Sequence, residues 1–130
     1  MIVSLHVATG AAAGAISGSR LRALTLGPLL HLAGDLLPHR DIDSRRFEIS
    51  SGLFCLALLV ARRGPFDAAT LGAAASSVPD LEHIVPSLRI GGRKLFHGWL
   101  GWHRSGPFPA EIQLVVAGAI VGALIAHRAE

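Results

Sequence analysis

The chain divides into five apolar segments, each separated from the next by a short stretch that contains arginine, glycine or proline. Apolar and polar residues do not alternate strictly within these segments, so the pattern predicts no β-strand. Alanine and glycine are instead mixed with leucine, isoleucine and valine over lengths that are typical of helices. We therefore expect an all-α protein with helices at 2–17, 21–37, 48–61, 67–84 and 110–127.

Length and composition predict where this helical protein resides. A chain of 130 residues forms one domain, and its content of 51% hydrophobic and only 16% charged residues is typical of membrane proteins. We expect residues 1–130 to form a single small membrane-embedded bundle of about five helices. Most of the apolar runs are shorter than a bilayer span, so the alternative is a water-soluble domain with buried core helices.

The net charge of +3 changes this picture little. It comes mainly from arginines at the ends of apolar segments, where they would contact the head groups of membrane lipids. No basic stretch with interleaved aromatic residues is present, so we expect no nucleic-acid partner. Three glycines at four-residue spacing, Gly10, Gly14 and Gly18, indicate a close-packing helix face that would permit a homo-oligomer.

The histidines are distributed unevenly between the two ends of the expected bundle. If consecutive helices run in alternating directions, six of the seven histidines fall at one end, together with most of the acidic residues. Chance would scatter them over both ends, so this asymmetry predicts a functional site. A small excess of basic residues at the same end favours the cytoplasmic side for the site.

The motif that best defines the expected site begins at His31. His31, Asp35 and His39 follow one another at intervals of four, so a helix would present them on one face until Pro38 disturbs its last turn. Polar groups in an apolar run cost free energy unless they are paired, and a shared metal ion is the simplest partner. Alternatively, Asp35 caps or salt-bridges a neighbouring element and the histidines are structural.

Further ligand candidates lie in other segments. Asp80 and His83 are three residues apart, which is close enough to share a metal on a helix. His6 is a single histidine in the first apolar segment, and His97 lies in the glycine-rich stretch 91–107. We therefore predict a set of metal ligands: His6, His31, Asp35, His39, Asp80, His83 and His97.

The donor atoms in this set are imidazole nitrogens and carboxylate oxygens. This combination indicates zinc, with manganese or iron as alternatives, and the number of candidates allows one or two divalent ions. Asp41 and Glu82 are the predicted catalytic residues, because each carboxylate could accept a proton from a metal-activated water. The single Cys55 is expected to fill space rather than to carry chemistry.

Three short motifs resemble a known family. They are His6 with Gly10, the His31/Asp35 pair followed by Pro-His-x-Asp, and the Pro-Asp-x-acid-His element that ends at His83. The chain is similar to the small prokaryotic inner-membrane, metal-dependent hydrolases typified by the LexA-regulated inner-membrane hydrolases, and is distantly similar to zinc-dependent phospholipase C. The resemblance implies a helical membrane protein with a divalent metal site and hydrolase activity.

Residues and resemblance together predict hydrolysis of a lipid-like or phosphoester substrate by metal-activated water. The alternative is a non-catalytic membrane protein that binds or transports a metal ion. A transporter should carry ionisable groups at mid-membrane and on both sides, whereas those of this chain gather at one end.

Overall fold

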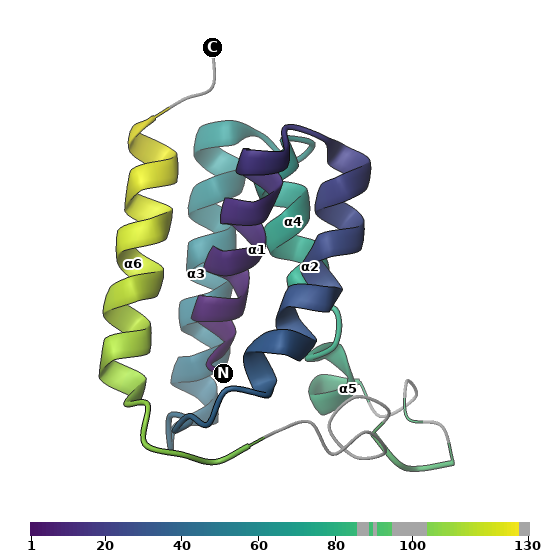
Figure 1. Cartoon of the computed structure of the whole chain (residues 1–130), viewed down its shortest axis with the longest axis vertical. Coiled ribbons are helices and arrows are strands. Elements are labelled where there is room, and N and C mark those ends of the chain that lie inside the picture. Colours follow the sequence, from purple (N-terminus) through teal and green to yellow (C-terminus); the bar gives the residue numbers. More distant parts are fainter. Residues whose placement is uncertain (86–88, 90, 95–103, 128–130) are drawn as a thin grey trace.

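The computed structural model describes residues 1–85, 89, 91–94 and 104–127, without the side chains of residues 83 and 84. Within these ranges the regular elements are helices, so the all-α prediction is confirmed. Five longer helices run up and down side by side, and a short one lies below α4 (Figure 1). They are α1 (Val3–Ser17), α2 (Arg20–Asp35), α3 (Arg45–Arg63), α4 (Ala68–Ser76), α5 (Leu81–Ile84) and α6 (Ala110–Ala126).

Local sequence accounts for most helix ends. The side chain of Ser19 accepts a hydrogen bond from the N–H of Arg22 and so caps α2, and the side chain of Asp67 caps α4 in the same way through the N–H of Ala69. Gly18 closes α1 in the left-handed conformation, with a φ of 59°, that glycine adopts most easily. The stretches between the apolar segments therefore act as helix boundaries.

The predicted single helix over 67–84 is wrong. The helix ends at Ser76, and the backbone N–H groups of Ser77 and Val78 donate to carbonyls only three residues earlier, at 3.0 and 3.2 Å. Pro79 explains the break, because proline has no N–H and its ring disfavours a helical conformation of the preceding residue. As a result, Asp80 lies on a turn between α4 and α5 instead of on a helix face.

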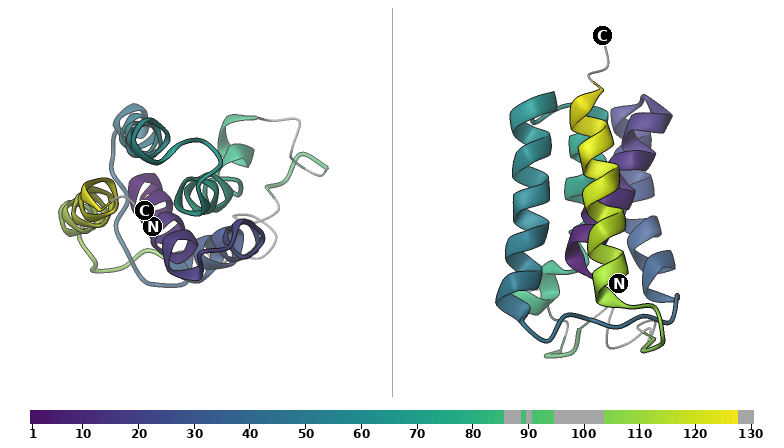
Figure 2. Two further views of the ribbon diagram at one scale, coloured as in Figure 1. Left: turned by 90° about the horizontal axis from the view of Figure 1, so that it is seen from above. Right: turned by 90° about the vertical axis from the view of Figure 1, so that its left-hand side faces the viewer.

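Helix α1 lies in the middle of the bundle and contacts α2, α3, α4 and α6 (Figure 2). Its closest approach is to α4, along a line that we call the α1–α4 seam (Gly10, Gly14, Ala68 and Gly72). A Cβ atom added to Gly72 would lie 2.2 Å from the carbonyl oxygen of Gly10. The glycine face predicted from the sequence is thus used for close packing within the chain.

Small side chains fill much of the interior, and many large ones lie outside. The buried core includes Ala8, Ala11, Ala69 and Ala73, whereas Ile16 is 88% and Val115 is 72% exposed. The close backbone contact along the seam leaves no room for larger residues between α1 and α4. Among the described residues, no helix combines the length and the apolar character needed to cross a bilayer.

Candidate metal centre

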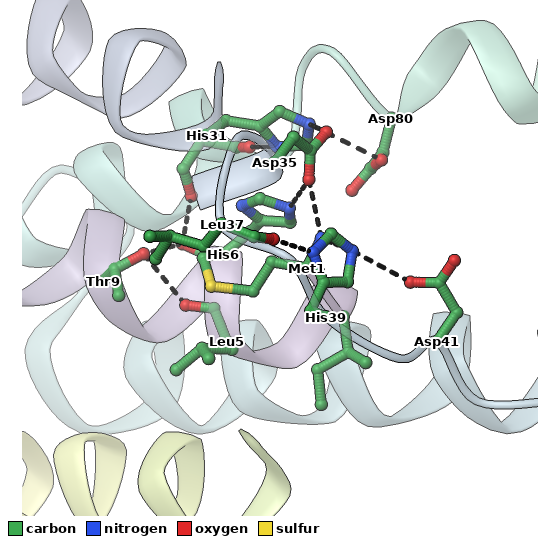
Figure 3. Close-up of polar contacts among 12 residues, drawn as sticks. Met1, Leu5, His6, Thr9, His31, Asp35, Leu37, His39, Asp41 and Asp80 are labelled. Atoms are coloured by element: carbon green, nitrogen blue, oxygen red, sulfur yellow. Dashed lines mark hydrogen bonds and ion pairs between the residues drawn. The ribbon is translucent and has the colours of Figure 1, made fainter. Parts of the chain in front are cut away.

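Two helices bring three predicted ligands together. His6 of α1 and His31 and Asp35 of α2 are all buried, and each offers a ligand atom within 4.8 Å of the other two. We call these three residues the His–Asp cluster (Figure 3). Asp35 Oδ1 lies 3.0 Å from His6 Nε2, and Asp35 Oδ2 lies 3.4 Å from His31 Nε2. The two imidazole rings stack with their centroids 3.7 Å apart.

His31 is oriented by a backbone group of α4. Its Nδ1–H donates a hydrogen bond of 2.7 Å to the carbonyl oxygen of Ser76, and a carbonyl oxygen can only accept. In the neutral ring Nε2 therefore carries the lone pair, and this atom faces Asp35 and, at 3.8 Å, Asp80 Oδ1. Metal-binding histidines are commonly oriented in this manner, with one nitrogen on a carbonyl and the other on the ion.

His6 is held neutral by its surroundings. Burial lowers its pKa to about 3; the hydrogen bond to Asp35 opposes this shift, and the electrostatic effects of His31 and of the Met1 amino group add to it. Within the part of the chain that the structure describes, His6 Nδ1 has no hydrogen-bond partner. A neutral imidazole is the form that binds a metal, so the environment of His6 suits a ligand.

His39 lies beside the His–Asp cluster, but it is not on the helix that was predicted to carry it. Helix α2 ends at Asp35, so His39 projects from the following segment and not from the same helix face as His31. The Met1 amino group donates to Asp35 Oδ1 at 2.6 Å and also contacts His39 Nε2. His39 Nδ1–H donates to the carbonyl of Leu37 at 2.6 Å. Pro38 accounts for the early helix end, as it does not support helical geometry at Leu37.

The remaining predicted residues have different positions. Asp80 lies next to the cluster, and Asp41 Oδ1 lies 3.2 Å from His39 Nε2. Glu82 is buried, and Arg89 donates to its backbone carbonyl at 3.0 Å. The side chain of His83 and all of His97 lie outside the described residues.

A pocket of about 180 Å³ opens beside the His–Asp cluster, between α1, α3 and the turn before α5. We call it the α1–α3 pocket. One end is polar and is formed by Asp35, Asp41, Arg45, Glu48, Ser77 and Asp80. The rest of the wall is apolar and is formed by Met1, Val3, Val7, Ile49, Gly52, Leu53, Leu56 and Leu81. Glu82 lies outside this set of described lining residues, so the geometry gives it no contact with the pocket.

Glu48 is a pocket residue that the sequence reasoning missed as a site residue. Burial raises the pKa of its carboxyl group, the carboxylates of Asp41 and Asp80 raise it further, and the N–H of Val3 acts in the opposite direction. A usable signal was present, since Glu48 is the sole acidic residue of the segment 45–63. Ser76 gave no such signal, because it orients His31 through a backbone carbonyl that any residue could supply.

The geometry therefore brings together two imidazoles and a carboxylate that could hold a metal ion, next to a pocket with a largely apolar wall. The family resemblance noted from the sequence stays a prediction. Comparisons of the chain with protein-family models, with curated proteins and with solved structures find no match.

Proposed function

We propose that this protein is a metal-dependent hydrolase that holds a divalent cation at the His–Asp cluster. The observation that carries the proposal is the set of three buried ligand atoms within 4.8 Å of one another. Zinc suits two imidazole nitrogens and a carboxylate oxygen best, and Asp80 is placed to act as a fourth ligand. With Asp80 as a fourth protein ligand, a water molecule or the substrate would take a fifth position, to which zinc can expand.

The protein residues around the site have distinct roles in this proposal. When bound, the cation supplies the Lewis acidity that brings the pKa of a water molecule toward 7. Asp41 lines the pocket and is the proton acceptor, with Glu48 as a second carboxyl group at the same end. Arg45 supplies a positive charge for an oxygen of the substrate. Ser76 keeps the His31 lone pair directed toward the cation.

The pocket and the surface support a lipid-like or phosphoester substrate taken from a membrane. Apolar walls lead to a polar end, which matches an amphiphile better than a sugar or a nucleotide. Large exposed side chains such as Ile16, Leu21 and Leu29 would lie against membrane lipids. We propose the prokaryotic inner membrane as the location, with the site end toward the cytoplasm.

A second candidate is a non-catalytic protein that binds or transports a metal ion. The position of Glu82 favours it, because one of the two predicted proton acceptors does not line the pocket among the described residues. The same ligands would then form a sensing or transfer site. The two candidates share the metal centre and differ only in turnover.

Elemental analysis of the purified protein tests the shared part of both candidates. His31→Ala and Asp80→Ala should lower the metal content, and His127→Ala, which removes a histidine outside the cluster, should leave it unchanged. Unchanged metal in both cluster variants would contradict the site. Hydrolysis of p-nitrophenyl esters and of bis-p-nitrophenyl phosphate, with and without added Zn²⁺, then separates the enzyme from the non-catalytic protein.

A further inference from the structure

We propose that the α1–α3 pocket binds the alkyl chain of a single-chain amphiphile whose head group carries no negative charge. The proposal deepens the proposed function, on which it rests for the reaction alone, since it narrows the lipid-like or phosphoester class to lipid-like substrates without a negative charge at the same site. Binding in the pocket can be measured without turnover, so the two proposals fail separately.

The walls of the pocket are suited to one chain. Val3 and Val7 of α1 line the pocket together with Leu53 and Leu56 of α3, and the charged lining residues come from the end of the bundle that carries the His–Asp cluster. A cavity of about 150 Å³ holds one benzene molecule, so the pocket volume of about 180 Å³ takes an alkyl segment of roughly six to eight carbons. Leu53 lines the pocket yet is 61% exposed, so a chain can enter between α1 and α3.

The charges at the polar end select the head group. Among the described lining residues, four carboxyl groups, those of Asp35, Asp41, Glu48 and Asp80, meet two positive groups, the Arg45 guanidinium and the Met1 amino group. One divalent cation would balance these charges. No net positive charge is then left to bind a carboxylate or a phosphate, so head groups without a negative charge are favoured.

Photolabelling locates and ranks the ligands directly. The protein is held in an amphipol, so that no detergent tail competes, and is labelled with an octanol analogue that carries a diazirine on its chain. We expect crosslinks at the apolar wall, for example at Val7 or Leu56. Competing n-alkyl alcohols should gain about fourfold in potency per methylene up to roughly six to eight carbons and then level off. Octyltrimethylammonium should compete like octanol, and octanoate should be at least tenfold weaker.

Neighbouring residues on α3 provide a matched pair of variants. Leu53→Asp places a charge on the pocket wall, whereas Phe54→Asp places the same charge on a residue that is equally exposed, at 64%, and lies outside the lining. We expect Leu53→Asp to weaken competition by octanol at least tenfold and Phe54→Asp to leave it unchanged. Leu53→Asn gives a second, uncharged test, and circular dichroism checks that each variant folds.

Three outcomes would overturn the proposal: octanoate competing as well as octanol, no dependence on chain length, or equal effects of Leu53→Asp and Phe54→Asp. The labelling is repeated after removal of metal by a chelator. The expected labelling without metal-dependent hydrolysis would support the pocket and contradict the proposed function. Hydrolysis without labelling of the pocket wall would do the reverse.

Discussion

Two polar clusters occupy opposite ends of the bundle and differ in how fully their groups are paired. At the end where α3 passes into α4, Arg63 Nε donates to Asp67 Oδ1 at 2.8 Å, and Arg63 Nη1 donates to the carbonyls of Leu124 and His127 at 3.0 and 2.9 Å. We call Arg63 and Asp67 the Arg–Asp clamp. At the other end lies the His–Asp cluster, beside the N-terminus (Figure 1).

The difference in pairing indicates that the clamp stabilises the fold and that the His–Asp cluster does not. The clamp residues are hydrogen-bonded to each other, to a carbonyl at the C-terminal end of α6 and to the first turn of α4. These bonds offset the free-energy cost of burying the polar groups, so the clamp stabilises the fold. In the His–Asp cluster, His6 Nδ1 is buried without a hydrogen-bond partner among the described residues, and burial holds the pKa of His6 at about 3. An apolar side chain there would favour stability more, so the buried imidazole supports the proposed metal site.

The largest effect that tests this comparison is loss of metal from Asp35→Asn. Loss of a residue that merely orients a ligand costs about 10- to 100-fold in metal affinity, so loss of a direct carboxylate ligand should cost at least about 100-fold. The affinity is measured by competition with a chromophoric chelator. Asp67→Asn makes the same change in the clamp and should leave the affinity unchanged. Equal affinities of the two variants would remove the distinction between the clusters.

The next largest effect is a loss of stability, and we expect it from a change in the clamp and not in the His–Asp cluster. Arg63→Met keeps the aliphatic stem but removes the donors to Asp67 and to the two carbonyls of α6. Hydrogen bonds of charged groups contribute about 1.5–3 kcal/mol each, so we expect the free energy of unfolding to fall by about 2–3 kcal/mol. Urea denaturation followed by circular dichroism measures it. The metal affinity should not change, and a loss below about 0.5 kcal/mol would show that the clamp is dispensable.

The third effect is a pH dependence of the metal-free protein that arises from His6. Its pKa is about 3 in the folded chain and near 6.5 when unfolded, so the unfolded state takes up the proton first as the pH falls. Stability is therefore full above pH 6.5 and declines between pH 6.5 and about 3. Between pH 7 and 5 the wild type should lose about 2 kcal/mol more than His6→Asn. Asp35, His31 and the Met1 amino group surround His6 in both proteins, so the difference isolates residue 6.

Patterns within a few residues of the sequence predicted the helices and the His31/Asp35 pair of the site. His31 and Asp35 are four residues apart on one helix, and their proximity follows from helix geometry alone. Caps such as Ser19 and Asp67 likewise act over a few residues. Pro79 is a local signal for a helix end in the same way, whereas the apolar run before it favours a longer helix than the structure has.

The rest of the site depends on contacts between distant segments. His6 joins the cluster because α1 packs against α2, and Ser76 of α4 bonds to both helices: its hydroxyl donates to the backbone carbonyl of His6 at 2.7 Å and its carbonyl accepts from His31. The spacing of Gly10 and Gly14 predicts a close-packing face, but it does not show that Gly72 of α4 is the partner. The pocket position of Glu48 similarly requires α3 to pack against α1.

The smallest effect separates the two clusters by the pH range in which each one acts. Burial alone would raise the pKa of Asp67, but hydrogen bonds from Arg63 and from the N–H of Ala69, together with the Arg63 charge, hold it below its ordinary value. The carboxylate thus contributes stability above the unfolded pKa near 3.9, and this stability is lost as the pH falls through the lower folded pKa.

Asparagine caps helices as well as aspartate does, so Asp67→Asn isolates the charge. Because this ion pair is partly exposed, the wild type should lose less than about 1 kcal/mol more than Asp67→Asn between pH 5 and 3 in urea titrations. A larger loss, or one that begins above pH 5, would mean that the acid sensitivity of the fold resides in the clamp and not in His6.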